Sequence, residues 1–473
     1  MKLPEPGAGE TPDHLSVMGP AAVNRLALRC RVLIVGLIFF TALGVRLLNW
    51  QSHHDEASAV QTSVALNYKH QATLIQANGV ASLYDASSST NNPDLMGHPP
   101  GYPILLSVMY RVGGQSDTAT QFLQIILDSL SAVIIALIAF EFFPAAIGLI
   151  AGLMTAFAPQ FSWNSLTLLP DSLATLPILV TVLIIARTCR RPGGPGRSEL
   201  LPILIAGALI GVSVWLRANA LLLAPFLACL LLFICKRGAR LRPAFVLVCG
   251  ALLIISPLTI RNAIVFGKFI PVSLGAGQTL VEGIADYNTD GSLGLPQTDV
   301  ELVRGEVKTS KRPDYANSLF TPDGTERDRA RLARGLAVIR AHPFWFAGVM
   351  IRRAASMLRL ERTPLRLAAA DSGRWQLLFQ GPLRAVQKLF ITAIFLPLAL
   401  IGAGILLYGR HFQKLAILLV VPCYYFCTQS ALHTEYRYVL VIHYFLFALA
   451  AVAVYSIACR IRQSLAEEQP GPG

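Results

Sequence analysis

Charged side chains are scarce in this sequence. Of its 473 residues only 14% are Asp, Glu, Lys or Arg, whereas 54% are hydrophobic. Average soluble domains are about one-quarter charged, so this composition excludes a water-soluble globular protein. A lipid bilayer is the expected solvent.

Three further features are absent. The chain shows no internal repeat, which disfavours the repeat-built secondary transporters. No short apolar segment with a small-residue cleavage site opens the chain, so the first apolar run is expected to be a retained helix. The eight cysteines all lie in or beside apolar runs, and no disulfide framework is expected.

Long apolar runs, by contrast, are abundant. About 20 helical residues cross roughly 30 Å of hydrocarbon, and ten runs approach or reach this length. They are residues 32–50, 122–140, 144–157, 170–186, 201–215, 218–235, 244–260, 389–408, 415–430 and 439–459. The sequence therefore predicts an all-α polytopic membrane protein with about ten transmembrane helices.

Lysine and arginine orient these helices, because cationic flanks tend to stay in the cytoplasm. They concentrate in alternate short segments and predict a cytoplasmic N-terminus, and the membrane is expected to be the plasma (inner) membrane. The predicted parts are a cytoplasmic tail (1–31), an N-terminal membrane module (32–260) with a first outer loop (51–121), a long outer loop (261–388), C-terminal helices (389–459) and a cytoplasmic tail (460–473). The net charge of +13 thus reflects membrane topology, and no nucleic-acid partner is expected.

Both outer loops contain stretches that resemble interfacial helices. Residues 104–112 are apolar but too short to cross a bilayer. Residues 329–360 are basic and amphipathic, with Pro343 opening a second apolar turn. Their arginines, Arg331 among them, could meet lipid phosphates; plain anchoring to anionic lipid is the alternative.

Polar side chains share one face of the second apolar run. Gln121, Gln124 and Asp128 follow a spacing of three and four residues, which places them on one side of a helix. A charged residue at membrane depth is costly, so this side is expected to face the bundle interior. It either lines a cavity or fixes helix packing by hydrogen bonds, and packing is the favoured interpretation for Asp128.

Ionisable residues also follow the first apolar run directly. His53, His54, Asp55 and Glu56 form either an ordinary polar flank or part of a site at the outer edge of the membrane. Residues 97–103, which read GHPPGYP, come next in the same loop and contain His98 and Tyr102.

These motifs resemble the C-type membrane glycosyltransferases, in particular the group of protein O-mannosyltransferases and lipid A aminoarabinose transferases (glycosyltransferase family 39). That group has an Asp-Glu pair soon after the first span and a His-Pro-Pro-x-Tyr-Pro stretch some tens of residues later. Further similar stretches follow in the same order, namely LPD at 169–171, WLRANA at 215–220, IRN at 260–262, FGKFIPVS at 266–273 and EYRY at 435–438. The resemblance therefore extends over residues 30–460.

The resemblance implies a catalytic carboxylate that deprotonates the acceptor hydroxyl in an inverting, single-displacement reaction. Asp55 is the expected base, with Glu56 as its neighbour, and Asp171 is the second acidic residue expected in the site. Asp171 after Pro170 is equally an ordinary helix start. Asp55 and Asp171 are also the candidate ligands of a divalent metal ion.

The remaining candidate residues are expected to bind substrate. Arginines at the outer ends of spans stand at the depth of lipid phosphates, which their planar fork can bind in bidentate fashion; snorkelling to the interface is the alternative. The expected substrate-binding residues are His98, Tyr102, Arg217, Arg261, Arg437 and Tyr438.

The sequence thus predicts a hexosyl- or pentosyltransferase that uses a polyprenyl-phosphate sugar. Its acceptor is a lipid, a glycan or a protein outside the cytoplasm, and no nucleotide or redox cofactor is expected. Two rivals remain open, namely another lipid-linked glycan ligase or polymerase, and a flippase or transporter of lipid-linked sugars.

Overall fold

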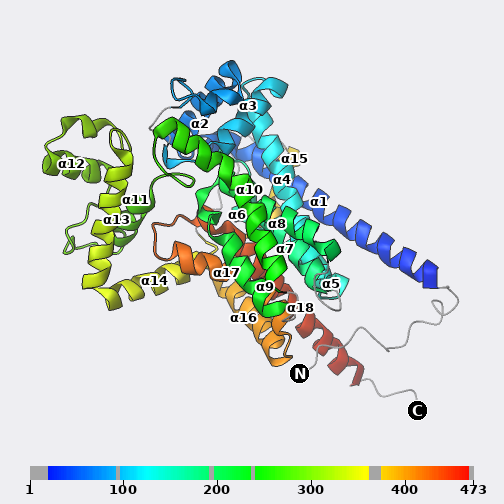
Figure 1. Cartoon of the computed structure of the whole chain (residues 1–473). Helices are drawn as coiled ribbons and strands as arrows, with labels where there is room; N and C mark the ends of the chain where they lie inside the picture. The colour runs from blue at the N-terminus through cyan, green and yellow to red at the C-terminus, as the bar shows by residue number, and fades with distance from the viewer. Residues whose placement is uncertain (1–19, 92–95, 191–196, 236–239, 362–373, 468–473) are drawn as a thin grey trace, which may run out of the picture.

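The chain forms a bundle of long helices with a helical outer part, as a computed structural model shows (Figure 1). The structure describes residues 20–91, 96–190, 197–235, 240–361 and 374–467, and within them every regular element is an α- or 3-10 helix. The predicted all-α class is confirmed. A helix satisfies its own backbone hydrogen bonds, as a hydrocarbon solvent requires.

Helices occupy all ten apolar ranges. They are α1 (Pro20–Ser58), α4 (Asp117–Phe140), α5 (Ala145–Phe157), α7 (Asp171–Arg190), α8 (Leu200–Leu216), α9 (Leu223–Ile234), α10 (Leu241–Phe266), α16 (Thr392–Tyr408), α17 (Phe412–Gln429) and α18 (Leu440–Glu467). Lipid-facing positions such as Phe245 and Leu253 on α10 are largely exposed. The arrangement fits a multi-pass membrane protein.

Not every one of these helices is long enough to cross a bilayer alone. Within the described residues, five pass by length and composition, namely α1, α4, α7, α10 and α18 with the turn before it. A sixth would be α16 joined to residues 378–387, across a bend of 58°. Helix α5, helix α8 and residues 218–234 are shorter. Helix length and composition thus support five or six of the roughly ten predicted spans among the described residues.

Small residues bring α8 and α10 into direct contact. A Cβ atom at Gly207 would lie 2.0 Å from the backbone oxygen of Leu247, and one at Gly250 would lie 2.2 Å from that of Leu204. Close backbone approach through glycine is a common way to pack helices in membranes. It brings the end of α8, where Arg217 lies, next to α10.

An ion pair ties the first span to the second. Arg46 of α1 and Asp128 of α4 are both almost fully buried, with Nη2 and Oδ2 2.6 Å apart, and the Tyr444 hydroxyl of α18 donates to Asp128 at 3.1 Å. The predicted packing role of Asp128 is confirmed, because its carboxylate joins three helices.

The predicted first outer loop lies across one end of the bundle. It contains α2 (Thr62–Asn78), the 3-10 helix η2 (Val80–Tyr84) and α3 (Gly101–Gly113), which Figure 1 shows beside each other at the top. The predicted short apolar run, residues 104–112, lies within α3. Tyr102, Leu106 and Tyr110 on α3 pack into a cluster with Tyr68 of α2, so one side of α3 faces protein.

The long outer loop forms a group of helices that projects to the side of the bundle (Figure 1). The elements of this group are α11 (Ala276–Ala285), α12 (Asp299–Ser310), η6 (Pro313–Asn317), α13 (Gly324–Ala341) and α14 (Pro343–Met357). Helix α15 (Arg374–Gln387), at the end of the same loop, lies against the bundle instead, where it contacts α1 and α5 (Figure 1). The helix break at Pro343 is confirmed. The expectation that Arg331 meets lipid is wrong, because Arg331 and Arg327 are buried in ion pairs with Glu306 of α12, at 2.6 and 2.7 Å.

Candidate active site

The candidate site is built around a buried carboxylate at the first residue of α7. Asp171 is 1% exposed, and its Oδ1 lies 2.9 Å from Nη1 of Arg217, which directly follows α8. Its Oδ2 lies 3.8 Å from Nη1 of Arg437, in the 3-10 helix η7 (Tyr436–Val439) before α18. Neither carboxylate oxygen has a hydrogen-bond partner of good geometry among the described residues, so Asp171 holds the two arginines by charge.

A second carboxylate holds Arg437 through hydrogen bonds. Nε and Nη2 of Arg437 donate to the two carboxylate oxygens of Glu435, at 2.8 and 2.9 Å. Burial acts to raise the pKa of Glu435, but the hydrogen bonds and charge of Arg437 outweigh it and lower that pKa. This bidentate pair leaves Nη1 of Arg437 facing Asp171.

Tyr438 joins the two arginines. Its ring lies under the Arg217 guanidinium, 3.9 Å from ring centroid to Cζ, and its hydroxyl donates to Glu435 at 3.2 Å. A cation above an aromatic face is stabilised by the ring quadrupole. Two separate motifs, WLRANA with Arg217 and EYRY with Arg437 and Tyr438, are therefore brought together.

His98 and Tyr68 contact each other near this cluster. Their rings make an edge-to-face contact at 5.5 Å. The surrounding protein atoms replace much of the water around the His98 imidazole, which lowers its pKa most, and the charges of Arg217 and Arg437 lower it further, from 6.5 to about 4. Part of the His98 side chain still reaches solvent. His98 is therefore neutral at physiological pH, and its imidazole can accept or donate a hydrogen bond without adding charge.

The two acidic residues at the end of α1 differ in exposure. Asp55 is 95% exposed, with Oδ1 3.5 Å from Nε2 of His54. Glu56 is about half exposed and pairs with the buried His53, whose ring contacts Trp163 in the short helix α6 (Pro159–Asn164). Glu56 thus faces the protein, whereas Asp55 faces the space outside it.

Amide side chains of α4 connect the end of α1 to the start of α7. Gln121 Nε2 donates to the backbone oxygens of His54, at 3.2 Å, and Leu166, at 2.9 Å. Gln124 Nε2 donates to the oxygen of Thr167 at 2.6 Å, and its Oε1 accepts from the Tyr102 hydroxyl at 2.9 Å. The polar face predicted for α4 therefore holds the loop that leads into Asp171.

Two predicted substrate ligands have other surroundings. Tyr102 is fully buried, and its hydroxyl bonds to Gln124. Arg261 donates to Leu83 O at 3.1 Å and to Asn91 Oδ1 at 2.5 Å, which fastens η2 to α10. The structure thus brings neither residue into the Asp171 cluster, and each stabilises the first outer loop.

The described residues do not form a metal site around the predicted pair. Among them, no three His, Cys, Asp or Glu side chains gather with the spacing of metal ligands. Asp171 faces two guanidinium groups, and their positive charges oppose a divalent cation at the same carboxylate. The predicted Asp55 and Asp171 metal ligation does not fit this arrangement.

Sequence reasoning missed the role of two residues. Glu435 is expected from the EYRY stretch only to lie near Arg437, and its spacing of two residues from Arg437 does not predict a bidentate pair. Asn164 lies on α6, and its side chain bonds the Tyr436 hydroxyl beside Arg437. No local signal distinguishes Asn164 from any other polar residue.

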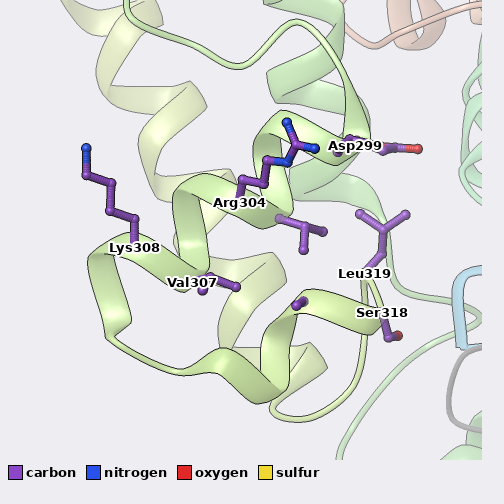
Figure 2. Close-up of a pocket in the computed structure, with 9 residues that line it drawn as sticks. Asp299, Arg304, Val307, Lys308, Ser318 and Leu319 are labelled. Atoms are coloured by element: carbon purple, nitrogen blue, oxygen red, sulfur yellow. The ribbon is translucent and has the colours of Figure 1, made fainter.

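A separate hollow lies in the outer helices, away from this cluster. Figure 2 shows side chains of α12 and of the segment after η6 around it, and its volume is about 510 Å³. Its lining includes the apolar residues Val303, Val307 and Leu319 and the cations Arg304 and Lys308. It contains none of the predicted site residues.

Comparisons with known proteins agree with the fold and with part of the sequence. Residues 97–260, which contain His98, Asp171 and Arg217, match the family of dolichyl-phosphate-mannose-protein mannosyltransferases. A search of curated protein sequences found no match. The resemblance to C-type membrane glycosyltransferases is confirmed over the matched segment.

Solved structures of archaeal oligosaccharyltransferases share the architecture of this chain. The apo oligosaccharyltransferase of Archaeoglobus fulgidus aligns with a TM-score of 0.53 and 15% identity, over 93% of this chain and 52% of that one. The archaeal oligosaccharyltransferase AglB from Archaeoglobus fulgidus, in complex with an inhibitory peptide and a dolichol-phosphate, aligns with a TM-score of 0.51 and 15% identity, over 94% of this chain and 52% of that one. ArnT from Cupriavidus metallidurans, bound to undecaprenyl phosphate, aligns with a TM-score of 0.36 and 15% identity, over 94% of this chain and 81% of that one. This chain spans about half the length of the archaeal enzyme, with which it shares a fold.

Proposed function

We propose that this chain is a glycosyltransferase that moves a hexosyl or pentosyl group from a polyprenyl-phosphate donor to an acceptor outside the cytoplasm. The observation that carries the proposal is the convergence of Arg217 and Arg437 on buried Asp171. Two of these residues lie inside the segment that matches the mannosyltransferase family. The plasma (inner) membrane is the proposed location, with the site on its outer face.

The arginines would bind the phosphate that leaves. As the acceptor oxygen bonds to the anomeric carbon, the bond from that carbon to the phosphate oxygen breaks, and negative charge grows on the phosphate. Preorganised cations aimed at such charge stabilise a transition state. Arg437 offers Nη1 for this role, because Glu435 engages its Nε and Nη2.

Asp171 would act as a positioning residue for both cations. The Asp171 carboxylate attracts Nη1 of Arg217 and Nη1 of Arg437, so both guanidinium groups point toward it. Its negative charge also offsets the repulsion between the two neighbouring cations. With Asp171 and Glu435 ionised, the two carboxylates balance the two arginines. A phosphate would then compete with Asp171 for the guanidinium donors.

Asp55 is the proposed base that takes the acceptor proton. Its exposed carboxylate at the outer end of α1 is accessible to an acceptor that arrives from outside. Glu56, which is partnered by His53, is the alternative base. The acceptor can be a lipid, a glycan or a protein, and the archaeal enzyme of the same fold has been solved with an acceptor peptide.

Release of free polyprenyl phosphate tests the proposal against a flippase. The purified chain in lipid nanodiscs would be given a labelled polyprenyl-phosphate mannose and an extract of cell-envelope acceptors. A transferase converts the donor to polyprenyl phosphate and labels the acceptor, whereas a flippase leaves the donor intact. Intact donor after prolonged incubation, with each of several sugars, would contradict the proposal.

A further inference from the structure

Helix α11 contacts the segment that leads to Glu435 and Arg437. Residues 430–434 connect α17 to Glu435. Thr279 and Gly283 of α11, and Asp286, which directly follows α11, touch this segment, and their spacing of four and three residues places them on one side of the helix. The backbone oxygen of Thr279 accepts from His433 N at 2.7 Å. Oδ2 of Asp286 lies 2.9 Å from Nδ1 of His433.

Gly283, between these two positions, allows the closest approach. A Cβ atom there would lie 2.5 Å from His433 N and 2.7 Å from the carbonyl carbon of Leu432. Both are backbone atoms, which cannot turn aside as a flexible side chain can. Any larger residue at 283 therefore has to push α11 and the segment apart.

Arg353 of α14 fastens the same two elements from another side. It is 3% exposed, and it donates to the backbone oxygens of Ser430, at 2.8 Å, and of Gly283. Its guanidinium also lies 3.6 Å from Asp286. A buried charge with several backbone acceptors holds its surroundings in one arrangement.

Helix α11 is itself fixed to the rest of the outer helices. Oδ1 of Asp328 on α13 accepts from the backbone N of Gly277, at 3.1 Å, and of Gln278, at 3.2 Å, in the first turn of α11. Helix α13 is in turn joined to α12 by the ion pairs of Glu306. A displacement of these outer helices is thus transmitted to residues 430–434.

We infer that the long outer loop positions the phosphate-binding arginine through a clamp made of Gly283, Asp286 and Arg353 on residues 430–434. The inference rests on the proposed function for what Arg437 binds. These three residues touch neither Asp171 nor Arg217 in the interactions described above, so they are positioning residues. A shift of about 1 Å in a positioned group can cost about 100-fold in rate, and only one residue separates Thr434 from Tyr436 and η7.

The test compares two glycine substitutions in the full chain in nanodiscs. Gly283→Ala adds a methyl group that meets the segment, whereas Gly305→Ala on α12 meets nothing within 4 Å. Hydrogen exchange reports the order of residues 430–438, and binding of undecaprenyl phosphate reports the site. We expect Gly283→Ala to raise exchange in 430–438 and to weaken phosphate-lipid binding by about tenfold, which is 1.4 kcal/mol, with both unchanged in Gly305→Ala.

Unchanged exchange in a folded Gly283→Ala protein would overturn the clamp. Unchanged binding despite faster exchange would overturn its role at the site. If the wild-type chain itself fails to bind undecaprenyl phosphate, the proposed function fails, and the exchange result still decides whether the clamp exists.

Asp286→Asn provides a second variant that keeps the shape of the side chain. The hydrogen bond with Asp286 raises the pKa of His433 above 6.5. The negative charges of Asp286, of Glu282 on α11 and of Glu435 act in the same direction, and Arg353 of α14 contacts Asp286. A raised histidine pKa stabilises the folded state at low pH, and this contribution is lost as pH rises through the raised value. We expect protection of 430–438 to fall as pH rises through the raised His433 pKa in the wild type, and to fall much less in Asp286→Asn, where Glu282 and Glu435 alone remain. An equally strong pH dependence in Asp286→Asn would contradict the clamp.

Discussion

Oδ1 of Asp171 lies 2.9 Å from Nη1 of Arg217, and both side chains are largely buried where α7 begins and α8 ends. Asp128 and Arg46 make a similar buried pair deeper in the bundle, at 2.6 Å. Both are buried pairs of an aspartate and an arginine. They differ because Asp171 also faces a second arginine, with its Oδ2 3.8 Å from Nη1 of Arg437.

Asp171→Asn and Asp128→Asn form a matched pair of variants. Each removes the partner of a buried arginine, and breaking such a pair costs about 3–5 kcal/mol of stability. We expect both to lower the melting temperature, but only Asp171→Asn to lower turnover per folded molecule, by at least about 100-fold. Equal turnover in the two variants would remove Asp171 from the site.

Arg437→Lys tests the forked hydrogen bonds. A lysine keeps the charge but cannot donate from two nitrogens to Glu435 or present a third to a phosphate. We expect the KM for the donor to rise about tenfold or more, as the loss of a charged hydrogen bond implies, with the KM for the acceptor nearly unchanged. Arg304→Lys, on exposed α12, is the control, and a donor KM that matches this control would leave Arg437 with a structural role alone.

Asp55→Asn tests the proposed base. The amide keeps the size of the carboxylate and cannot take a proton, and a general base contributes about 10²- to 10⁴-fold in rate. We expect kcat to fall by at least about 100-fold while binding of undecaprenyl phosphate persists. Glu56→Gln is measured in parallel, and a larger loss in Glu56→Gln than in Asp55→Asn would assign the base to Glu56.

His98 is expected to make the stability of the folded chain depend on pH. Its pKa is lowered to about 4 by desolvation and by the nearby arginines, so between pH 6.5 and 4 the unfolded chain binds more protons than the folded one. Stability is therefore expected to fall as pH decreases through this interval. His98→Gln should flatten that slope in thermal unfolding measurements. His70→Gln, an exposed position on α2, should retain it, and an unchanged slope in His98→Gln would show that other groups cause it.

Cysteine labelling tests the proposed orientation. On a cysteine-free background, Thr309→Cys lies in the long outer loop and Ser198→Cys follows the linker between α7 and α8. A membrane-impermeant thiol reagent added to intact cells should label Thr309→Cys and leave Ser198→Cys unlabelled until the cells are opened. The reverse pattern would place Asp171 and its arginines on the cytoplasmic side.

The sequence by itself determined the helical class, the ten apolar ranges, the helix break at Pro343 and the packing role of Asp128. These follow from local rules, because a bilayer rewards long apolar helices and penalises an unpaired charge wherever it occurs. The motifs around His98, Asp171, Arg217 and Arg437 also identified residues that do meet.

The tertiary structure alone decided which of the candidate arginines share a site. Arg217, Arg261 and Arg437 have the same local setting, each at the end of an apolar run, and no spacing separates them. Arg261 bonds to Leu83 and Asn91 of the first outer loop, whereas the other two converge on Asp171. An ion pair forms wherever the packed helices bring opposite charges within a few ångströms, and that distance is set by packing across the whole bundle.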